Sequence, residues 1–430
     1  MTEPVVVPRS EHSISRSRID PDALKVLYRL HQNDHVAYLV GGSVRDLLLE
    51  RRPKDFDIGT SAHPYQVKRL FRNCWIIGRR FRLAHVRFGP KTIEVATFRR
   101  QLSAQELAAA DAAADEATAA PDADSARDRL VHRDNTFGTP EEDAFRRDFT
   151  INALFYDIGT FSIIDYTGGL EDLERRLVRC IGDPTERFRE DPVRMLRAVA
   201  MAARLDFTID QPIESAIAEH RSEIARSAPA RLMEEFYKLL RSGASERAFR
   251  MLAERRLLEP ISAELQSHAS IGLWESLRAL DAYRGRFESS PEELSNAILL
   301  GSLLIPLGHG IRSLSPAPPP SGDFRKEPRI SLGLLPLARR DIERLRQILS
   351  LQRRLTDLTL SPRARRSLMT RGPFREALTW LEIHGRSPEV LEHWRGFIEA
   401  TATVEGEEME APPPRRRRRR RRRGFRRPST

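Results

Sequence analysis

The stretch from residue 37 to residue 58 constrains the fold more than any other part of the chain. It begins with an apolar run that predicts a strand, turns at Gly41 and Gly42, and continues as an amphipathic run that predicts a helix. A second strand ends the unit. Backbone N–H groups at a helix N-terminus bind phosphate, so the turn is a candidate phosphate site, and Arg45 adds positive charge there.

The second strand of this unit carries two aspartates, Asp55 and Asp57. Positions i and i+2 of a strand project from the same face, so both carboxylates point to one spot while Phe56 points into the core. Two like charges held this close repel each other, and a divalent cation relieves the repulsion. The aspartate pair and the glycine turn are each common on their own, since Asp-x-Asp and Gly-Gly both occur in ordinary loops. Together, in this order, they indicate phosphoryl or nucleotidyl transfer.

Length and composition narrow the class of protein. A chain of 430 residues can hold two or more domains. Its two cysteines, Cys74 and Cys180, provide no disulfide framework and predict a reducing compartment. The N-terminus has no apolar signal segment, and no apolar run is long enough to span a bilayer. We therefore expect a cytoplasmic protein without a membrane partner.

The formal net charge of +11 is concentrated at the C-terminus. Residues 415–423 are nine consecutive arginines, Arg426 and Arg427 add two more, and no acidic residue follows Glu410. The rest of the chain is therefore close to neutral. Such a tail binds RNA, DNA, anionic lipid or acidic protein by counterion release, or it stays solvated.

Strand patterns dominate the first part of the chain and helical spacing dominates the remainder, which predicts an α+β fold with a mixed-sheet head and an all-α neck and body. Runs 75–77, 83–88 and 92–97 are the clearest strands after the paired aspartates. We expect a flexible N-terminus at 1–18, a head at 19–168 with a mobile insertion at 101–134, a helical neck at 169–260, a helical body at 261–404 and a disordered arginine-rich tail at 405–430.

Glu94 lies on one of these strands and alternates with apolar neighbours. If that strand lies beside the strand of Asp55 and Asp57, Glu94 is a third carboxylate for a metal ion. The alternative is a solvent-facing glutamate on a half-buried strand.

Two later blocks combine aspartate with arginine. Arg147 and Asp148 precede an apolar helix start, where an aspartate also serves simply as a cap. In the second block, Asp191 stands at a predicted helix N-terminus, with Arg194 and Arg197 on one face of that helix. On an open surface, Asp191 and Arg194 would form a weak ion pair. In a cleft, the same pair offers an acceptor and a donor to a base edge.

In this order, the blocks resemble the nucleotidyltransferase superfamily of the DNA polymerase beta type, and most closely the bacterial branch shared by poly(A) polymerases and CCA-adding tRNA nucleotidyltransferases. The resemblance covers residues 20 to 260 and implies a nucleotidyltransferase head followed by a neck that binds nucleotide and RNA. Segments 78–89 and 135–148 look like the poly(A) polymerase version. The arginines of the first segment form either a solvated strand face or a strip for an RNA 3′ end.

The resemblance implies template-independent polyadenylation, in which an RNA 3′-OH attacks the α-phosphate of ATP and pyrophosphate leaves. CCA addition to tRNA from CTP and ATP is the near alternative, and a non-catalytic RNA-binding protein is the distant one. Hard carboxylate ligands suit Mg²⁺, and the resemblance implies a two-metal site, with one ion on Asp55 and Asp57 and a second at the leaving triphosphate. By resemblance, the catalytic residues are Asp55, Asp57 and Asp148, the metal ligands are Asp55, Asp57 and Glu94, and the nucleotide contacts are Gly41, Gly42, Arg45, Arg147, Asp191, Arg194 and Arg197.

The chain departs from these relatives at Ala200, where they usually carry arginine. The departure puts one triphosphate or packing contact in doubt. We expect Arg204, one helical turn later, to compensate in part.

Overall fold

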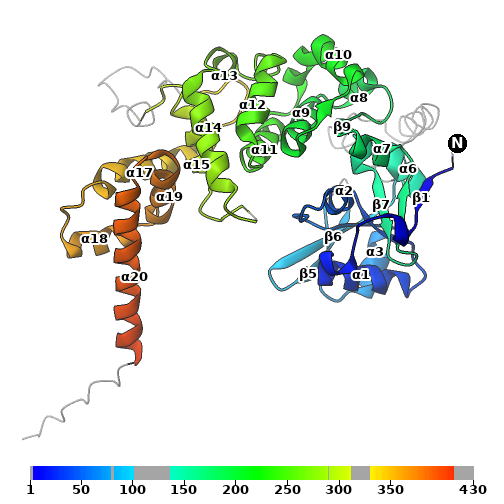
Figure 1. Cartoon of the computed structure of the whole chain (residues 1–430), viewed down its shortest axis with the longest axis horizontal. Helices are drawn as coiled ribbons and strands as arrows, with labels where there is room; N and C mark the ends of the chain where they lie inside the picture. Colours follow the sequence, from blue (N-terminus) through cyan, green and yellow to red (C-terminus); the bar gives the residue numbers. More distant parts are fainter. Residues whose placement is uncertain (1–2, 79–81, 101–135, 289, 311–329, 411–430) are drawn as a thin grey trace, which may run out of the picture.

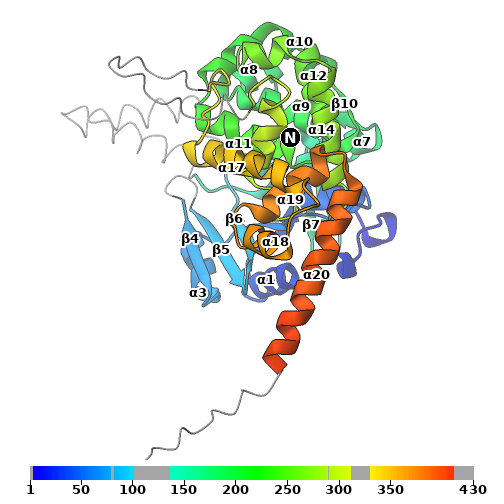
Figure 2. The ribbon, with the colours of Figure 1, turned by 90° about the vertical axis from the view of Figure 1, so that its left-hand side faces the viewer.

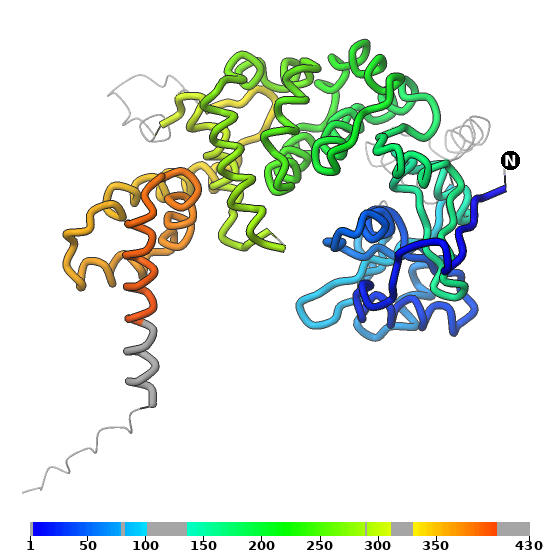
Figure 3. The backbone as a smooth tube through the Cα atoms, viewed as in Figure 1, coloured from blue at the N-terminus to red at the C-terminus, as the bar shows by residue number. Residues whose placement is uncertain are grey.

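The computed structural model describes residues 3–78, 82–100, 136–288, 290–310 and 330–410, with side chains described as far as residue 401. The expected insertion at 101–134, Arg79 and Arg80, and residues 411–430 of the expected tail lie outside these ranges. The described chain forms an arch, with a sheet-containing head at one end and helices along the rest (Figure 1). The tube in Figure 3 shows that the head and the last helices occupy opposite ends of this arch.

The head is built on one mixed sheet with the strand order β1-β8-β7-β2-β3-β6-β5-β4. Every neighbouring pair is antiparallel except β3 and β6, which run parallel. The predicted mixed-sheet head is therefore confirmed. Its strands are β1 (Val5–Val7), β2 (Ala37–Val40), β3 (Asp57–Thr60), β4 (Cys74–Ile77), β5 (Leu83–Phe88), β6 (Lys91–Thr97), β7 (Leu154–Asp157) and β8 (Ile163–Asp165).

Helices α1 (Pro21–His31) and α3 (Pro64–Leu70) cover one face of the sheet. Helix α1 begins at Pro21, because the Asp20 side chain accepts hydrogen bonds from two N–H groups of the first turn. The buried strand residues Ile58, Val86 and Val95 belong to the same hydrophobic core as these helices. The other described helical segments of the head are η1 (Arg9–Glu11), η2 (Arg16–Arg18), α2 (Gly42–Leu48), α6 (Pro140–Phe145) and η3 (Thr150–Asn152).

The remainder of the described chain is almost entirely helical, as predicted, except for a two-stranded parallel pair, β9 (Leu177–Val178) and β10 (Thr208–Ile209). The last helix reaches Glu410, six residues into the segment from 405 that we expected to be disordered. None of the described helices is long and apolar enough to cross a membrane. The segments are α7 (Gly169–Glu174), α8 (Pro184–Glu190), α9 (Val193–Leu205), α10 (Gln211–His220), η4 (Arg221–Arg226), α11 (Pro229–Leu240), α12 (Ser245–Glu254), α13 (Ala263–Ser267), α14 (Ile271–Arg284), α15 (Asn296–Leu304), α17 (Arg339–Leu355), α18 (Pro362–Met369), α19 (Phe374–His384) and α20 (Pro388–Glu410).

Candidate active site

The turn between β2 and α2 depends on glycine at its first position. Gly41 has a φ of 70°, which favours glycine, and a Cβ there would lie 2.9 Å from Nη1 of Arg147. Helix α2 then starts at Gly42, the second glycine of the turn. The turn therefore brings backbone N–H groups and the guanidinium of Arg147 to one place.

Arg45 is buried beneath this turn. Its Nε and Nη2 atoms donate to Oδ1 of Asp46 at 2.8 and 2.7 Å, and Nη1 donates to Oδ1 of Asn152. Burial lowers the pKa of Arg45, although the charge of Asp46 opposes this effect. In this arrangement Arg45 ties α2 to the segment around Asn152, and its predicted phosphate contact stays a prediction.

Asp57 is the first residue of β3, and Asp55 lies two residues before it, so the strand that was expected to carry both aspartates carries only Asp57. The parallel pairing places Ile58 opposite Val95, so Asp57 is level with Glu94 on β6. The condition for a third carboxylate is therefore met, because the Glu94 strand is the direct neighbour of β3. Surrounding protein atoms desolvate Asp57 and raise its pKa to about 6, and the charges of Glu94 and Asp55 add to this shift.

These carboxylates have the chemistry that a hard divalent cation requires. The pKa of Glu94 is also raised, by desolvation and then by Asp55, so the negative charge here is incompletely neutralised. Among the described residues, no group of three or more His, Cys, Asp or Glu side chains is placed so that it could hold a metal ion. The oxygen donors fit Mg²⁺ by type and charge.

Arg147 is held in place by Asp143, which the sequence analysis missed. Its Nε and Nη2 atoms donate to Oδ2 of Asp143 at 3.2 and 2.9 Å, and Nη1 donates to the Asn152 carbonyl at 3.1 Å. The charge of Arg147 also lowers the pKa of Asp57, against the larger effect of desolvation by nearby protein atoms. Asp143 stands four residues before Arg147 near a helix end, and this spacing could have revealed the pair.

Asp148 and Arg197, predicted from separate sequence blocks, meet in the structure. Nη2 of Arg197 on α9 lies 2.6 Å from Oδ2 of Asp148, although its N–H groups are not aligned on that oxygen. The other oxygen of Asp148 accepts from the N–H of Phe149 at 2.9 Å. The carboxylate is almost fully buried, and the ion pair connects the head to the helical part of the chain.

Asp191 and Arg194 are each paired with another residue in the structure, and their predicted contacts with the nucleotide base stay predictions. Asp191 ends α8 with an extended backbone, and its carboxylate accepts hydrogen bonds from Arg231 on α11 at 3.1 and 2.8 Å. Arg194 instead donates to Glu190 at 2.8 Å. The turn between α8 and α9 directs the Asp191 side chain toward α11, and no local pattern marks Arg231 as its partner because 40 positions separate them.

Arg204, which we expected to compensate in part for Ala200, donates to Oδ2 of Asp46 at 2.6 Å. Asp46 thereby binds Arg45 through one oxygen and Arg204 through the other. Arg204 thus connects α9 with α2 directly beneath the glycine turn.

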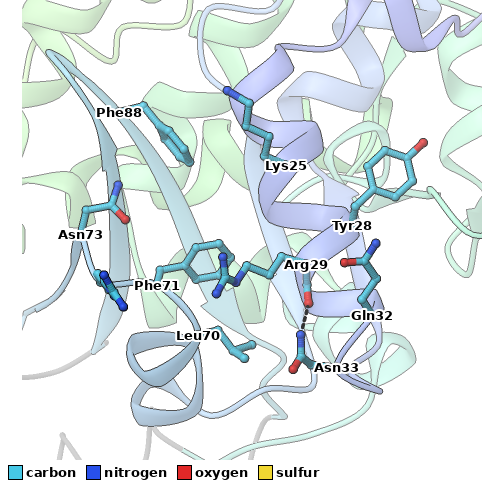
Figure 4. Close-up of a pocket in the computed structure, with 10 residues that line it drawn as sticks. Lys25, Tyr28, Arg29, Gln32, Asn33, Leu70, Phe71, Asn73 and Phe88 are labelled. Atoms are coloured by element: carbon cyan, nitrogen blue, oxygen red, sulfur yellow. Dashed lines mark hydrogen bonds between the residues drawn. The ribbon is translucent and has the colours of Figure 1, made fainter.

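A hollow of about 940 Å³ lies elsewhere on the head and contains none of the candidate active-site residues. It is lined by residues of α1, by the end of α3 and by Phe88 on β5, on the helix-covered side of the sheet (Figure 4). The Arg29 guanidinium lies 5.4 Å from the centre of the Phe71 ring there. The carboxylates of β3 and β6 therefore lie outside this hollow.

Three family models match the chain in order along its length. They are the poly A polymerase head domain at residues 37–179, the probable RNA and SrmB-binding site of polymerase A at 206–268, and the polymerase A arginine-rich C-terminus at 332–427.

The curated relatives are poly(A) polymerases and CCA-adding enzymes. Poly(A) polymerase I of Salmonella typhi and of Escherichia coli O157:H7 are each 48% identical over 256 residues, which is 60% of this chain and 53% of the relative. The CCA-adding enzyme of Lactobacillus helveticus is 36% identical over 239 residues, which is 56% of this chain and 54% of the relative. The chain thus spans about half the length of the curated relatives it matches.

Solved structures of CCA-adding enzymes share the architecture. The enzyme of Bacillus stearothermophilus in complex with CTP superposes with a TM-score of 0.58 at 27% identity, over 92% of this chain and 90% of that one. The Thermotoga maritima enzyme complexed with tRNA has a TM-score of 0.51 at 20% identity, over 92% and 85%. At 20% identity, the similarity to the Thermotoga maritima enzyme shows a shared fold and nothing more.

Proposed function

Because the chain belongs to the family that bacterial poly(A) polymerases share with CCA-adding tRNA nucleotidyltransferases, we propose that it polyadenylates RNA 3′ ends without a template. One observation carries the proposal at the site. The Arg147 guanidinium lies against Gly41 and also lowers the pKa of Asp57, so the proposed phosphate-binding turn and the candidate carboxylates share one arginine. The 48% identity to poly(A) polymerase I favours this product over CCA addition.

In the proposed reaction, the RNA 3′ oxygen forms a bond to the α-phosphorus of ATP, the bond between that phosphorus and the bridging oxygen breaks, and pyrophosphate leaves. The 3′-OH proton passes to solvent. Asp55, Asp57 and Glu94 would hold Mg²⁺, which when bound favours deprotonation of the hydroxyl and offsets charge on the phosphates. The N–H groups after Gly41 and the guanidinium of Arg147 would bind the triphosphate.

For base selection, we assign the acceptor role to Asp191, because a carboxylate accepts from the exocyclic amine of adenine. Arg231 orients this carboxylate through two hydrogen bonds, whereas Arg194 is engaged with Glu190. Asp148 and Arg197 would support the nucleotide between the head and the neck. We propose 169–260 as the nucleotide- and RNA-binding neck, in line with the RNA-binding family model that matches 206–268.

We propose that the protein is cytoplasmic, because its cysteines are reduced. Both cysteines, Cys74 and Cys180, are free and buried, which suits the reducing cytoplasm.

The decisive test is incubation of the purified chain with Mg²⁺, a short RNA and each nucleoside triphosphate separately, followed by sequencing of the products. We expect extension with ATP alone, to many residues, on RNAs unrelated to tRNA. Addition of C, C and A to a truncated tRNA would support the CCA-adding alternative instead. Binding of RNA without extension by any nucleotide would support a non-catalytic RNA-binding protein.

A further inference from the structure

A row of side chains connects the candidate carboxylates with the edge of the sheet. Asp57 on β3 is level with Glu94 on β6, Glu94 pairs with His85 on β5, and His85 pairs with Trp75 on β4. Residues directly opposite each other on neighbouring strands project from the same face. Trp75 therefore shares a face with Asp57, at a distance of about 14 Å if each inter-strand step is about 4.8 Å.

The end of this row at the sheet edge is apolar, aromatic and cationic. Trp75 is 50% exposed, and Ile77, two residues further along the same strand, is 49% exposed. The guanidinium carbon of Arg87 on β5 lies 5.7 Å from the centre of the Trp75 ring. We call Trp75, Ile77 and Arg87 the edge platform. Ile77 and Arg87 flank Trp75 on the same face of the sheet, with Ile77 opposite Leu83 and Arg87 beyond His85, so Trp75 has an apolar and a cationic neighbour.

The opposite face of the same strands is used for folding. Cys74, Ala84, Val86 and Ile93 are buried in the core beneath α1 and α3. On the edge-platform face, Trp75 and Ile77 stay about half exposed among the residues that the structure describes. Figure 1 shows the β5–β6 hairpin below the helices of the arch, and Figure 2 shows β4 and β5 at the outer edge of the head.

The exposed indole is distinctive within this chain. The chain has four tryptophans, and the other three, Trp274, Trp380 and Trp394, are 9%, 6% and 1% exposed. Each of these belongs to the hydrophobic core of the structure. Trp75 alone among the four is placed to meet a ligand with its ring.

We propose that the edge platform binds single-stranded RNA a few nucleotides upstream of the 3′ end that reacts at Asp57. An indole stacks on any base, so it suits a substrate of variable sequence, and Arg87 supplies the positive charge that a phosphate backbone requires. The row of paired residues leads from the platform to the carboxylates without crossing to another face. The proposal rests on RNA being the substrate, and it adds a binding surface to the proposed reaction.

A peptide strand is the other occupant that an edge such as β4 attracts, through backbone hydrogen bonds. Such a partner would use the N–H and C=O groups of β4 and would leave the ring face of Trp75 and the charge of Arg87 without a role. The cation beside the indole therefore favours RNA.

The test uses the intrinsic fluorescence of the full chain, since Trp75 is the exposed tryptophan. With Asp55→Asn to prevent turnover, titration with an oligoadenylate should quench part of the emission. The variant that also carries Trp75→Leu should lose this quenching and bind the RNA roughly 5- to 100-fold more weakly, as expected for the loss of one base stack. Tyr65→Leu is the matched control, because Tyr65 is 62% exposed but lies on α3, which covers the opposite face.

A second measurement separates this proposal from the reaction itself. In the active chain, Trp75→Leu should raise the KM for RNA and leave the KM for ATP unchanged, and Arg87→Gln should reduce the slope of log K against log salt by roughly 0.7. A chain that adds no nucleotide would refute the proposed function, while quenching in the titration would still support the platform. Equal RNA affinity and equal quenching in Trp75→Leu, Tyr65→Leu and their parent would overturn the platform.

Discussion

The Asp191 carboxylate accepts one hydrogen bond at each oxygen from the guanidinium of Arg231, at 3.1 and 2.8 Å. The bidentate geometry fixes the plane of the carboxylate, which a single contact would not do. The hydrogen bond to Asp191 also raises the pKa of Arg231, so the guanidinium stays charged under all ordinary conditions. The orientation of the candidate base-reading residue is thus set by a side chain on a separate helix.

Arg231→Gln is expected to reduce the preference for ATP over the other nucleotides by about tenfold or more, because it frees Asp191 to rotate. The pair is partly exposed, so the free energy of unfolding should change by only about 0–1 kcal/mol. Competition between ATP and CTP for one RNA primer measures the preference. Arg226→Gln is the control, since Arg226 is also an exposed arginine in an ion pair, with Glu223. Equal preference in both variants would remove Arg231 from base selection.

Asp57→Asn should reduce nucleotide addition by at least ~10²–10³-fold, comparable to the loss of one preorganised electrostatic contact. Asp55→Asn should have a similar effect, because both carboxylates are assigned to the same ion. Single-turnover extension of an RNA primer at saturating ATP and Mg²⁺ measures the chemical step. Asp34→Asn, an exposed residue with a positive φ that asparagine tolerates, controls for a general loss of charge. Near-normal rates in Asp57→Asn would refute the metal assignment.

Asp57 should also make the stability of the metal-free protein depend on pH. Its folded-state pKa is raised to about 6, above the value in the unfolded chain, so the folded protein retains an extra proton between about pH 4 and 6. Stability should therefore fall as pH rises through this window and stay low above it. Thermal unfolding in EDTA should show Asp57→Asn to be more stable than the parent at pH 7, with the difference disappearing near pH 4. Mg²⁺ should raise the melting temperature of the parent at pH 7 and leave that of Asp57→Asn nearly unchanged.

The sequence predicted those parts of the fold whose signals are local. Runs 75–77, 83–88 and 92–97 appear as strands within one residue of the predicted ends, because one face of each is buried and the alternation is clear. The mixed sheet and the helical remainder are likewise observed.

The partners of the site arginines could not be predicted from the sequence. A charged side chain at an expected phosphate site looks free in the sequence, yet Arg45 is buried and bound to Asp46 and Asn152. Similarly, Asp191 at the end of α8 is paired with Arg231 on α11 instead of with Arg194, three residues further along the chain. Ion pairs of this kind depend on how distant helices pack, and helical spacing within one segment carries no information about that.

Arg197→Met should destabilise the protein and impair catalysis together, because it leaves the buried carboxylate of Asp148 without its cation. Loss of a partner by a buried acidic group costs about 1–3 kcal/mol, and the partial exposure of Arg197 places the effect toward the lower end. Denaturant unfolding measures the stability change. Arg197→Lys should recover most of the stability but less of the activity, since lysine lacks the planar fork. Unchanged stability in Arg197→Met would show that the ion pair is dispensable.

Deletion of residues 412–430 should weaken RNA binding and flatten its salt dependence while leaving catalysis at saturating primer largely intact. This segment carries eleven arginines and no acidic residue, which equals the whole net charge of the chain. Each lost phosphate contact should reduce the slope of log K against log salt by roughly 0.7 for single-stranded RNA, so several lost contacts would be plainly visible. Filter binding at a series of salt concentrations measures the slope. Replacement of the arginines by lysines is the control that retains charge, and it should preserve most of the slope. An unchanged affinity after deletion would mean that the tail meets another polyanion, and loss of activity at saturating primer would mean that it acts at the active site.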